Sequence, residues 1–436
     1  MIPQGLESEI SQAGNIRSLD RRSRLRASIA GSAGNLIEWY DFYAYAYTAL
    51  YFAASFFPSG DRTAQLINVA AIYAAGFLVR PIGAWYFGRF ADRRGRRAAL
   101  VTSVLLMGAG SLLIAILPGY EVIGVAAPVL LLIARLMQGF SSGGQYGAAA
   151  SYLSEVAESG KRGFFASFQF VTLIGGQLSA LLILGLLQWL LGEVALREGA
   201  WRIPFAIGAI AAISILLFKD QMHETVSRQT SDAGSLRALA RHPRAMFTVM
   251  TLSAAGALAL YSFTTYMQKY LVNTAGLDAP AASKVMIVAT LGFMLLQPII
   301  GTVSDRIGRR TCLLLFTGGM TIAAVPLFSA LEGASDPYQA FALIACALFI
   351  LSFYTSVSGL FKAELFPTEV RALGVGLGHA IASALFGGTA EFVALQLKQA
   401  GAEWVFGWYL ALVCGAAFVV SLRMREPRAA GHIDGA

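Results

Sequence analysis

Long apolar runs, separated by short polar segments, set the pattern of this chain. Four of the runs contain no Asp, Glu, Lys or Arg: Ala98–Tyr120, Ala245–Gln268, Thr311–Leu331 and Trp404–Leu422. A helix needs about 20 mostly apolar residues to cross the hydrocarbon core of a bilayer. Each of these runs is therefore long enough to form a membrane-spanning helix.

The same pattern along the whole chain predicts twelve membrane-spanning helices joined by short loops. We expect them at residues 30–57, 65–87, 99–118, 124–150, 164–191, 203–218, 246–270, 280–303, 312–331, 338–362, 373–398 and 404–422. The longest connection, 219–245, is polar and divides them into two groups of six. The predicted parts are a tail (1–29), a six-helix bundle (30–218), a middle loop (219–245), a second six-helix bundle (246–423) and a tail (424–436).

The composition agrees with an all-α membrane protein. Of the 436 residues, 56% are hydrophobic and 13% are charged, whereas soluble domains have about 25% charged residues. The three cysteines lie in apolar runs without metal-ligand spacing, and the first 29 residues lack the apolar core of a cleavable signal peptide. No GxSxG motif, Walker lysine or zinc-ligand cluster is present. We therefore expect no enzyme activity and no metal or cofactor. We expect transport that is driven by a gradient.

The distribution of Lys and Arg predicts the orientation, because loops rich in these residues stay in the cytoplasm. Of 33 such residues, 24 fall in the two tails, the middle loop and the loops after helices two, four, eight and ten. Six fall on the opposite side: Arg62, Arg197, Arg202, Lys269, Lys284 and Lys398. Both termini and the middle loop are therefore expected to be cytoplasmic. The same rule explains the net charge of +8 without a nucleic-acid partner.

Two loops repeat each other and divide the chain into related halves. The segment GRFADRRGRR (88–97) resembles GTVSDRIGRR (301–310), and a Glu–Arg pair seven residues apart occurs as Glu155/Arg162 and Glu364/Arg371. Parallel repeats of this kind place the solute site between the halves, near the middle of the membrane.

The repeated charges suggest two gating networks on the cytoplasmic side. We hypothesise that the first contains Asp92, Arg93, Arg96, Glu155 and Arg162, and the second Asp305, Arg309, Glu364 and Arg371. Asp305 is expected to cap the helix that follows it, Gly301 to allow close helix approach, and Gly308 to permit a tight turn. The alternative is that these charges only set the topology.

The repeated GxxxDRxGRR loop resembles the signature of the major facilitator superfamily. Other stretches resemble its metabolite:proton symporters, and among these the bacterial 2-oxoglutarate (alpha-ketoglutarate) permeases. They are GNLIEWYDFY (34–43), VRPIG (79–83), ARLMQG (134–139), FASFQFVTLIGGQ (165–177), WRIPF (201–205), FTTYMQKYLVNTAG (263–276) and KAELFP (362–367). Arg94 departs from the pattern, because such permeases have a histidine there, so no role of that histidine carries over.

The resemblance implies two pseudo-symmetric six-helix bundles, that is, the major facilitator fold. It also implies a monomer in the bacterial cytoplasmic (inner) membrane, surrounded by lipid, that carries an organic acid together with protons by alternating access. Uptake of 2-oxoglutarate or a related dicarboxylate is the first prediction. Another organic acid, or a zwitterion such as betaine or proline, is the second. A membrane sensor is disfavoured, because the tails are too short for a signalling domain.

Ionisable residues inside membrane helices are costly and therefore mark functional sites. After the loop residues are set aside, three cations remain: Arg80, Arg135 and Lys362. A guanidinium such as that of Arg80 suits a carboxylate. Lys362 either reaches the cytoplasmic surface or serves as a second cation for a dicarboxylate.

Two carboxylates in the first helix, Glu38 and Asp41, are the candidates for carrying the proton. The resemblance places helices one and four face to face, so either carboxylate could pair with Arg135. A carboxylate near a cation and a desolvated cavity can change its protonation state between conformations. The sequence does not choose between them, and a static ion pair is the alternative.

Other polar residues are expected to line the solute path or to bond neighbouring helices. They are Tyr73, Gln138, Tyr146, Gln169, Gln177, Tyr261, Thr264, Tyr266, Gln297 and Tyr354. His379 and Glu391 lie too far apart on one helix to touch directly. His379 is expected to be structural or to titrate near neutral pH.

Overall fold

The computed structural model describes residues 21–58, 60–94, 96–143, 146, 150, 160–218 and 236–427. Nearly all of these residues are helical, because apolar segments satisfy their backbone groups best as helices in a membrane, even where a Pro such as Pro81, Pro298 or Pro326 lies inside the helix. Eight helical stretches are long and apolar enough to cross a bilayer, and three more apolar helices are shorter.

The N-terminal half consists of six long helices. They are α2 (Arg21–Phe56), α3 (Arg62–Arg94), α4 (Arg96–Ile116), α6 (Ala126–Ser142), α8 (Arg162–Glu198) and α9 (Ile203–Phe218), with the short α5 (Tyr120–Ile123) and η1 (Ala200–Arg202) between them. The described helices of this half overlap the six predicted ranges, although α2 begins nine residues earlier than expected.

The C-terminal half repeats the arrangement with more interruptions. Its first helix runs through α11 (Pro243–Tyr261), η3 (Ser262–Tyr266) and α12 (Met267–Asn273), and its fifth through α17 (Arg371–Ala382), η5 (Ser383–Gly387) and α18 (Ala390–Gln399). The others are α13 (Ala279–Ile307), α14 (Arg309–Glu332), α15 (Pro337–Thr355) with α16 (Ser358–Glu364), and α19 (Val405–Arg423); the turns α10 (Leu236–Leu239) and η4 (Thr368–Val370) lie in connections.

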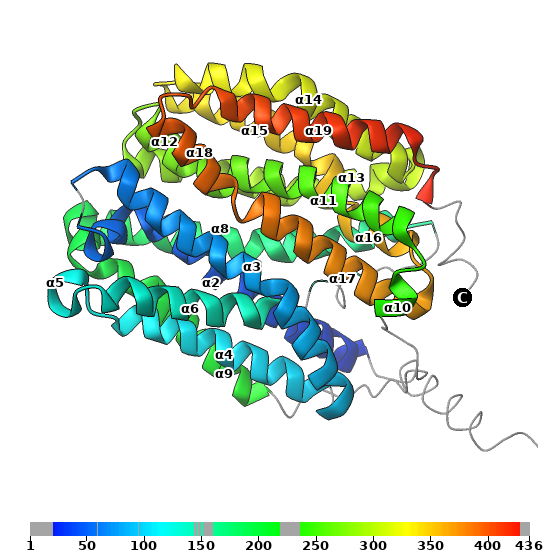
Figure 1. Ribbon diagram of the computed structural model, residues 1–436, viewed down its shortest axis with the longest axis horizontal. Coiled ribbons are helices and arrows are strands. Elements are labelled where there is room, and N and C mark those ends of the chain that lie inside the picture. Colours follow the sequence, from blue (N-terminus) through cyan, green and yellow to red (C-terminus); the bar gives the residue numbers. More distant parts are fainter. Residues whose placement is uncertain are drawn as a thin grey trace, which may run out of the picture.

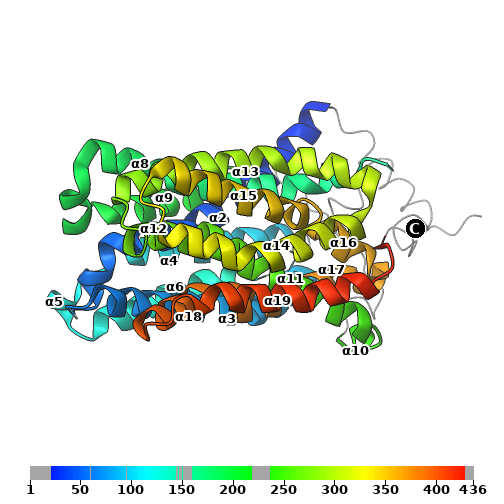
Figure 2. The same ribbon diagram turned by 90° about the horizontal axis from the view of Figure 1, so that it is seen from above.

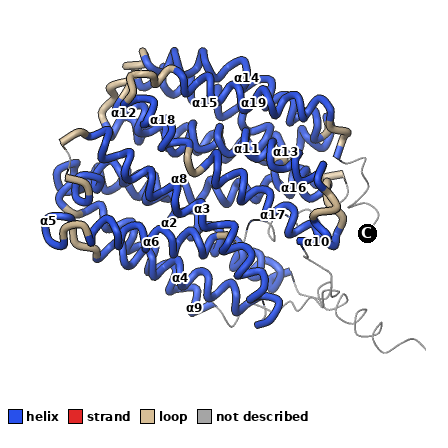
Figure 3. The backbone as a smooth tube through the Cα atoms, in the orientation of Figure 1, coloured by secondary structure: helices blue, strands red, loops and turns tan. Residues whose placement is uncertain are grey.

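The two halves lie side by side as bundles of roughly parallel helices (Figures 1 and 2). Figure 3 shows that most loops lie at the two ends, and short breaks at 356–357 and 388–389 interrupt two helices of the C-terminal half. Helix α8 packs along α13, and α3 along α17 and α18, so these pairs form the boundary between the halves. Both ends of the described chain lie at one end of the molecule, near α10 and α16 (Figure 1). We call this end the inner end and the opposite end, near α5, the outer end.

Segments η3 and η5 are π-helical turns, which occur most often at functional sites and which the sequence pattern did not predict. They lie near each other, where the aromatic rings of Tyr261 and Phe77 contact two glycines. A Cβ atom on Gly387 would lie 2.7 Å from the Tyr261 ring, and one on Gly388 would lie 2.5 Å from the Phe77 ring. Both glycines therefore fit only because they lack a side chain.

Helices α3 and α6 are in backbone contact along three glycines. A Cβ atom on Gly139 would lie 1.9 Å from the carbonyl oxygen of Gly76, and one on Gly143 would lie 2.0 Å from that of Arg80. This close crossing brings the helix that carries Arg80 against the helix that carries Arg135.

Lys269 and Glu391 form an ion pair between α12 and α18, with 2.6 Å between Nζ and Oε1. Both side chains are buried, at 1% and 4% exposure. The charge distribution along the sequence places Lys269 among the outer-side charges, at the end of the predicted helix 246–270. The helix extends past it to Asn273, and Glu391 compensates its buried charge. This pair also gives Glu391 a partner that sequence reasoning did not find.

Breaking this pair should destabilise the protein strongly, because one buried charge would lose its partner. We expect Glu391→Gln to cost about 3–5 kcal/mol, seen as a lower melting temperature in detergent. The double change Lys269→Met and Glu391→Leu should recover most of this loss.

The exposed pair Glu193–Arg197, with its side chains 38% and 47% exposed, provides the control. Glu193→Gln should hardly change the melting temperature. Equal melting temperatures of wild type and Glu391→Gln would show that the buried pair contributes nothing to stability.

Candidate functional site

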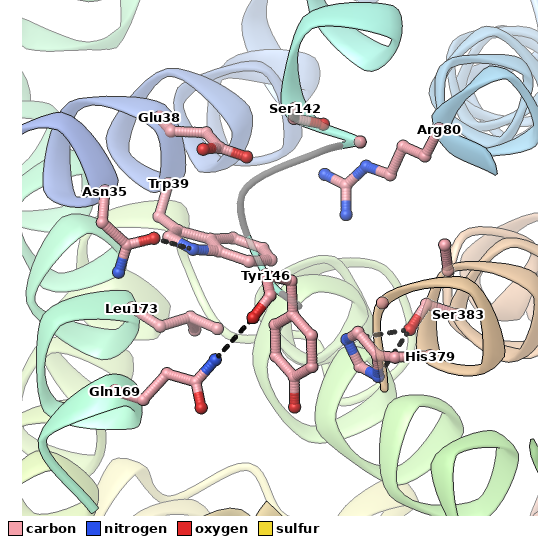
Figure 4. A pocket seen from close by; sticks show the side chains of 13 residues that line it. Asn35, Glu38, Trp39, Arg80, Ser142, Tyr146, Gln169, Leu173, His379 and Ser383 are labelled. Carbon is pink, nitrogen blue, oxygen red and sulfur yellow. Dashed lines mark hydrogen bonds between the residues drawn. The ribbon is translucent and has the colours of Figure 1, made fainter. Parts of the chain in front are cut away.

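A small cavity lies at the boundary of the two halves (Figure 4). Helices α2, α3, α6, α8 and α17 and segment η5 line it. Its wall consists of Asn35, Glu38, Trp39, Arg80, Ser142, Gly143, Tyr146, Gln169, Leu173, Gly376, His379, Ala380 and Ser383. The volume of about 30 Å³ has room for about two water molecules. A solute of several carbon atoms therefore requires the walls to separate.

Arg80 is the cation of this wall. Its guanidinium carbon lies 4.0 Å from the centre of the Phe77 ring and 4.2 Å from that of Phe42, so ring faces partly offset its charge. Nε and Nη2 are buried and have no hydrogen-bond partner among the described residues. These two donors can bind a carboxylate in the bidentate geometry that a guanidinium favours.

Glu38 lies across the cavity from Arg80 (Figure 4). The two charges interact electrostatically, but they form no ion pair within 4 Å, and Glu38 Oε2 has no hydrogen-bond partner among the described residues. An anionic solute on Arg80 would therefore compete with Glu38 for the same positive charge.

Lys362 is fully buried, so the prediction that it reaches the cytoplasmic surface is wrong. Its Nζ donates to Tyr146 Oη at 2.9 Å and to Ser358 Oγ at 2.8 Å, and it lies 3.2 Å from His379 Nδ1. No carboxylate pairs with it within the part of the chain that the structure describes. Tyr146 belongs to the N-terminal half, so this cluster also joins the two halves.

Asp41 and Arg135 are joined through an amide rather than directly. Arg135 Nη1 donates to Gln138 Oε1 at 2.7 Å, and Gln138 Nε2 donates to Asp41 Oδ2 at 2.6 Å. All three side chains are buried. The expected direct pairing of Asp41 or Glu38 with Arg135 is therefore corrected, because Gln138, one turn along α6, lies between the charges.

The environments of the two candidate carboxylates differ clearly. Glu38 faces the cavity, whereas Asp41 points away from it towards α9, where a Cβ atom on Gly208 would lie 2.5 Å from Asp41 Oδ1. Arg135 lies over the rings of Tyr45 and Tyr73, at 4.3 and 5.1 Å. Tyr73 and Gln138 thus surround the buried Arg135 instead of lining the cavity.

Of the predicted polar lining, only Tyr146 and Gln169 lie in the cavity wall. Tyr261 interacts with Arg80, and Tyr354 packs beside Lys362. The others bond elsewhere: Gln177 to Tyr47, Tyr266 to Glu403, Gln297 to Thr355, and Thr264 to the carbonyl oxygen of Leu260. For these four residues the structure favours the alternative that we left open, bonds within or between helices.

Asp305 joins the halves at the inner end. Its carboxylate accepts hydrogen bonds from the backbone N–H groups of Gly163 (2.8 Å) and Phe164 (3.1 Å), at the start of α8. The prediction that Asp305 caps the following helix is wrong. Glu426 accepts from the N–H groups of Arg309 and Arg310 and caps that helix instead.

The rest of the second charge network is partly assembled. Arg309 lies 3.1 Å from Asp305 and 3.7 Å from Glu364, and Arg371 Nε donates to the carbonyl oxygen of Phe366 at 3.3 Å. Gly301 touches Gly163 and Gly308 has a φ of +88°, as expected for close approach and a tight turn. In the first network, Glu155 and the side chains of Asp92, Arg93 and Arg96 lie outside the described residues, and Arg162 begins α8.

The halves are also in contact at the outer end. Gln188 Nε2 donates to Tyr51 Oη at 2.7 Å and to Ser283 Oγ at 3.0 Å, so α2, α8 and α13 meet there. Among the described residues, contacts thus bridge the halves on both sides of the cavity.

Sequence reasoning missed Asn35, Trp39, Ser142 and Ser383 in the cavity wall. A helical-face analysis could have found some of them. Asn35 lies three residues before Glu38, and Trp39 lies four residues after Asn35. Ser383 lies four residues after His379. Residues with these spacings share one helix face.

Comparisons with known proteins agree with this geometry. The family model described as "Major Facilitator Superfamily" matches residues 34–391 and 277–435. The alpha-ketoglutarate permease of Escherichia coli (strain K12) is 55% identical over 96% of this chain and 98% of that protein. A citrate-proton symporter of Salmonella typhi is 33% identical over 94% of this chain and 96% of that protein.

Solved structures show the same fold at low sequence identity. A D-xylose-proton symporter superimposes with a TM-score of 0.75 at 17% identity, covering 93% of this chain and 98% of that one. Two helical bundles, a cavity between them and these matches over nearly the whole chain lead to one assignment: the protein belongs to the major facilitator superfamily.

Proposed function

We propose that this protein is a secondary transporter that takes up 2-oxoglutarate, or a closely related dicarboxylate, together with protons. The observation that carries this proposal is Arg80, a buried guanidinium with two unpartnered donors in the wall of the cavity. The 55% identity to an alpha-ketoglutarate permease supports the choice of solute.

The two halves each supply one cation for a dicarboxylate. Arg80 lies in the N-terminal half, and Lys362 lies behind Tyr146 and His379 in the C-terminal half. A solute with a carboxylate at each end can interact with both cations and draw the halves together. Citrate, carried by a 33% identical relative, is a second candidate because it also has several carboxylates.

Glu38 and Asp41 remain the two candidates for carrying the proton. Glu38 competes with the solute for Arg80, so solute binding would favour protonation of Glu38. Asp41 is linked to Arg135 through Gln138, so movement of α6 against α2 would change its surroundings. Protonation in one conformation and release in the other would couple proton movement to solute movement.

The transport cycle requires the two ends to open alternately. Separation of Asp305 from the start of α8 would open the inner end, which the Lys and Arg distribution assigns to the cytoplasm with both termini. The protein works in this scheme as a monomer in the inner membrane, without a cofactor, and the proton gradient provides the energy.

Uptake into membrane vesicles tests the proposal. Vesicles that contain the protein should accumulate labelled 2-oxoglutarate when a pH gradient, acid outside, is imposed. A protonophore should abolish this accumulation, because the driving force is lost. Empty vesicles are the control, and uptake that ignores the gradient would exclude proton symport.

The two carboxylates can be separated by comparing uphill uptake with exchange. A carboxamide cannot take up the proton, so the change at the coupling residue, Asp41→Asn or Glu38→Gln, should abolish uphill accumulation. Exchange of labelled for unlabelled solute should continue, because exchange needs no net proton movement. Persistence of uphill accumulation in both variants would remove helix α2 from the proton path.

The inner contact should be weakened by Asp305→Asn, because the carboxylate charge that faces two backbone N–H groups and Arg309 is lost. In a cysteine-free background with Ser142→Cys as reporter, a membrane-impermeant maleimide should label the cavity from the cytoplasmic side several-fold faster.

Asp336→Asn is the matched control for this experiment. Asp336 also accepts from a backbone N–H at a helix start, that of Gln339 at 3.3 Å, but at the outer end and within one half. Labelling should not change there. Equal labelling in Asp305→Asn and wild type would rule out the gating role of Asp305.

A further inference from the structure

His379 is the one imidazole in the cavity wall. Its ring stacks on Tyr146 with 3.8 Å between centroids and an interplanar angle of 21°, and Figure 4 shows the two rings side by side below Arg80. The stack fixes the plane of the imidazole, so its two nitrogens have defined directions.

Lys362 determines which ring nitrogen carries the hydrogen. An ammonium group only donates hydrogen bonds, and Nζ of Lys362 lies 3.2 Å from His379 Nδ1. Nδ1 must therefore accept, which leaves the hydrogen of the neutral imidazole on Nε2. The other two Nζ hydrogens go to Tyr146 and Ser358, so Lys362 is held in place for this role.

The Nε2–H group is only weakly engaged within the protein. Ser383 Oγ lies 3.3 Å from Nε2 and 3.4 Å from Nδ1, which are long distances for such bonds. The amide of Asn35, by contrast, already bonds Thr172 and Trp39. Gln169 Nε2, another uncharged donor of the wall, is directed to the carbonyl oxygen of Tyr146 at 3.5 Å. His379 Nε2–H is thus an uncharged donor of the wall that ring stacking fixes in direction and that is available to a solute.

We propose that His379 Nε2–H binds the keto oxygen of the solute and so selects a 2-oxo dicarboxylate over the corresponding plain dicarboxylate. This proposal rests on the proposed function. Arg80 in the wall and Lys362 behind it attract the carboxylates, and a neutral donor matches a neutral carbonyl acceptor. Lys362 acts as a positioning residue, because it keeps the hydrogen on the nitrogen that faces the solute.

Competition between two dicarboxylates measures this selection. Glutarate has the same carbon chain as 2-oxoglutarate but lacks the keto oxygen. We define the selectivity ratio as the glutarate concentration that halves labelled uptake, divided by the corresponding concentration of unlabelled 2-oxoglutarate. In wild type the ratio should be about 3 to 10, which is the fold-change in affinity that one neutral hydrogen bond contributes.

Two amide substitutions separate the two ring nitrogens. His379→Asn places its amide near the Nδ1 position and can still accept from Lys362, but has no donor at the Nε2 position, so the ratio should fall to about 1. His379→Gln reaches the Nε2 position with an N–H group and should keep most of the ratio. Uptake is normalised to the amount of protein in the vesicle membrane.

A third variant, Ser383→Ala, excludes the neighbouring hydroxyl as the selecting group, because the ratio should be kept without it. The proposal is overturned if wild type does not discriminate, if His379→Asn keeps the wild-type ratio, or if Ser383→Ala loses it. Should His379→Asn not reach the membrane, loss of the ratio in His379→Gln would overturn the proposal equally. Absence of any 2-oxoglutarate uptake in wild type would instead refute the proposed function.

Discussion

The cost of placing charge inside a membrane is the constraint on which the rest of this structure depends. A charged side chain at that depth must be paired, hydrogen-bonded or covered by polarisable groups. The described cations use each of these solutions. Lys269 pairs with Glu391, Lys362 donates three hydrogen bonds to neutral partners, and Arg80 and Arg135 lie against aromatic rings. Arg80 and Arg135 each keep two donors without a hydrogen-bond partner among the described residues, and of these two cations only Arg80 lies in the wall of the cavity.

Close helix crossings make this compensation possible, because they fix the distances between groups on different helices. The backbone contact of α3 with α6 depends on Gly76, Gly139 and Gly143. At the inner end, Gly163 and Gly301 bring α8 so close to α13 that Asp305 reaches two backbone N–H groups of the other half. This contact at the inner end is thus formed by small groups, and a small separation of the helices would release it.

The sequence predicted most of the fold because hydrophobic length and charge distribution are local properties. The helix positions and the two halves follow from them. The contacts that the sequence could not predict depend on which faces of neighbouring helices meet. Lys269, at the end of a predicted helix, counts as an outer-side charge until Glu391 is seen opposite it. Gln138 separates Asp41 from Arg135 because of a rotation of α6 that spacing alone does not give, and the partner of Asp305 lies in the other half of the chain.

The buried charges in the cavity wall and on the helices beside it also bear on the choice of solute. With their usual charges, Arg80, Arg135 and Lys362 outnumber Glu38 and Asp41 by one positive charge in the described part of the chain. A zwitterion such as betaine would leave that charge uncompensated, whereas a dianion would turn the balance to one negative charge. One proton on Glu38 or Asp41 then makes the closed site neutral. Because desolvation penalises net charge most strongly when both ends are shut, a dianion that moves with a proton fits this site better than a zwitterion that moves alone.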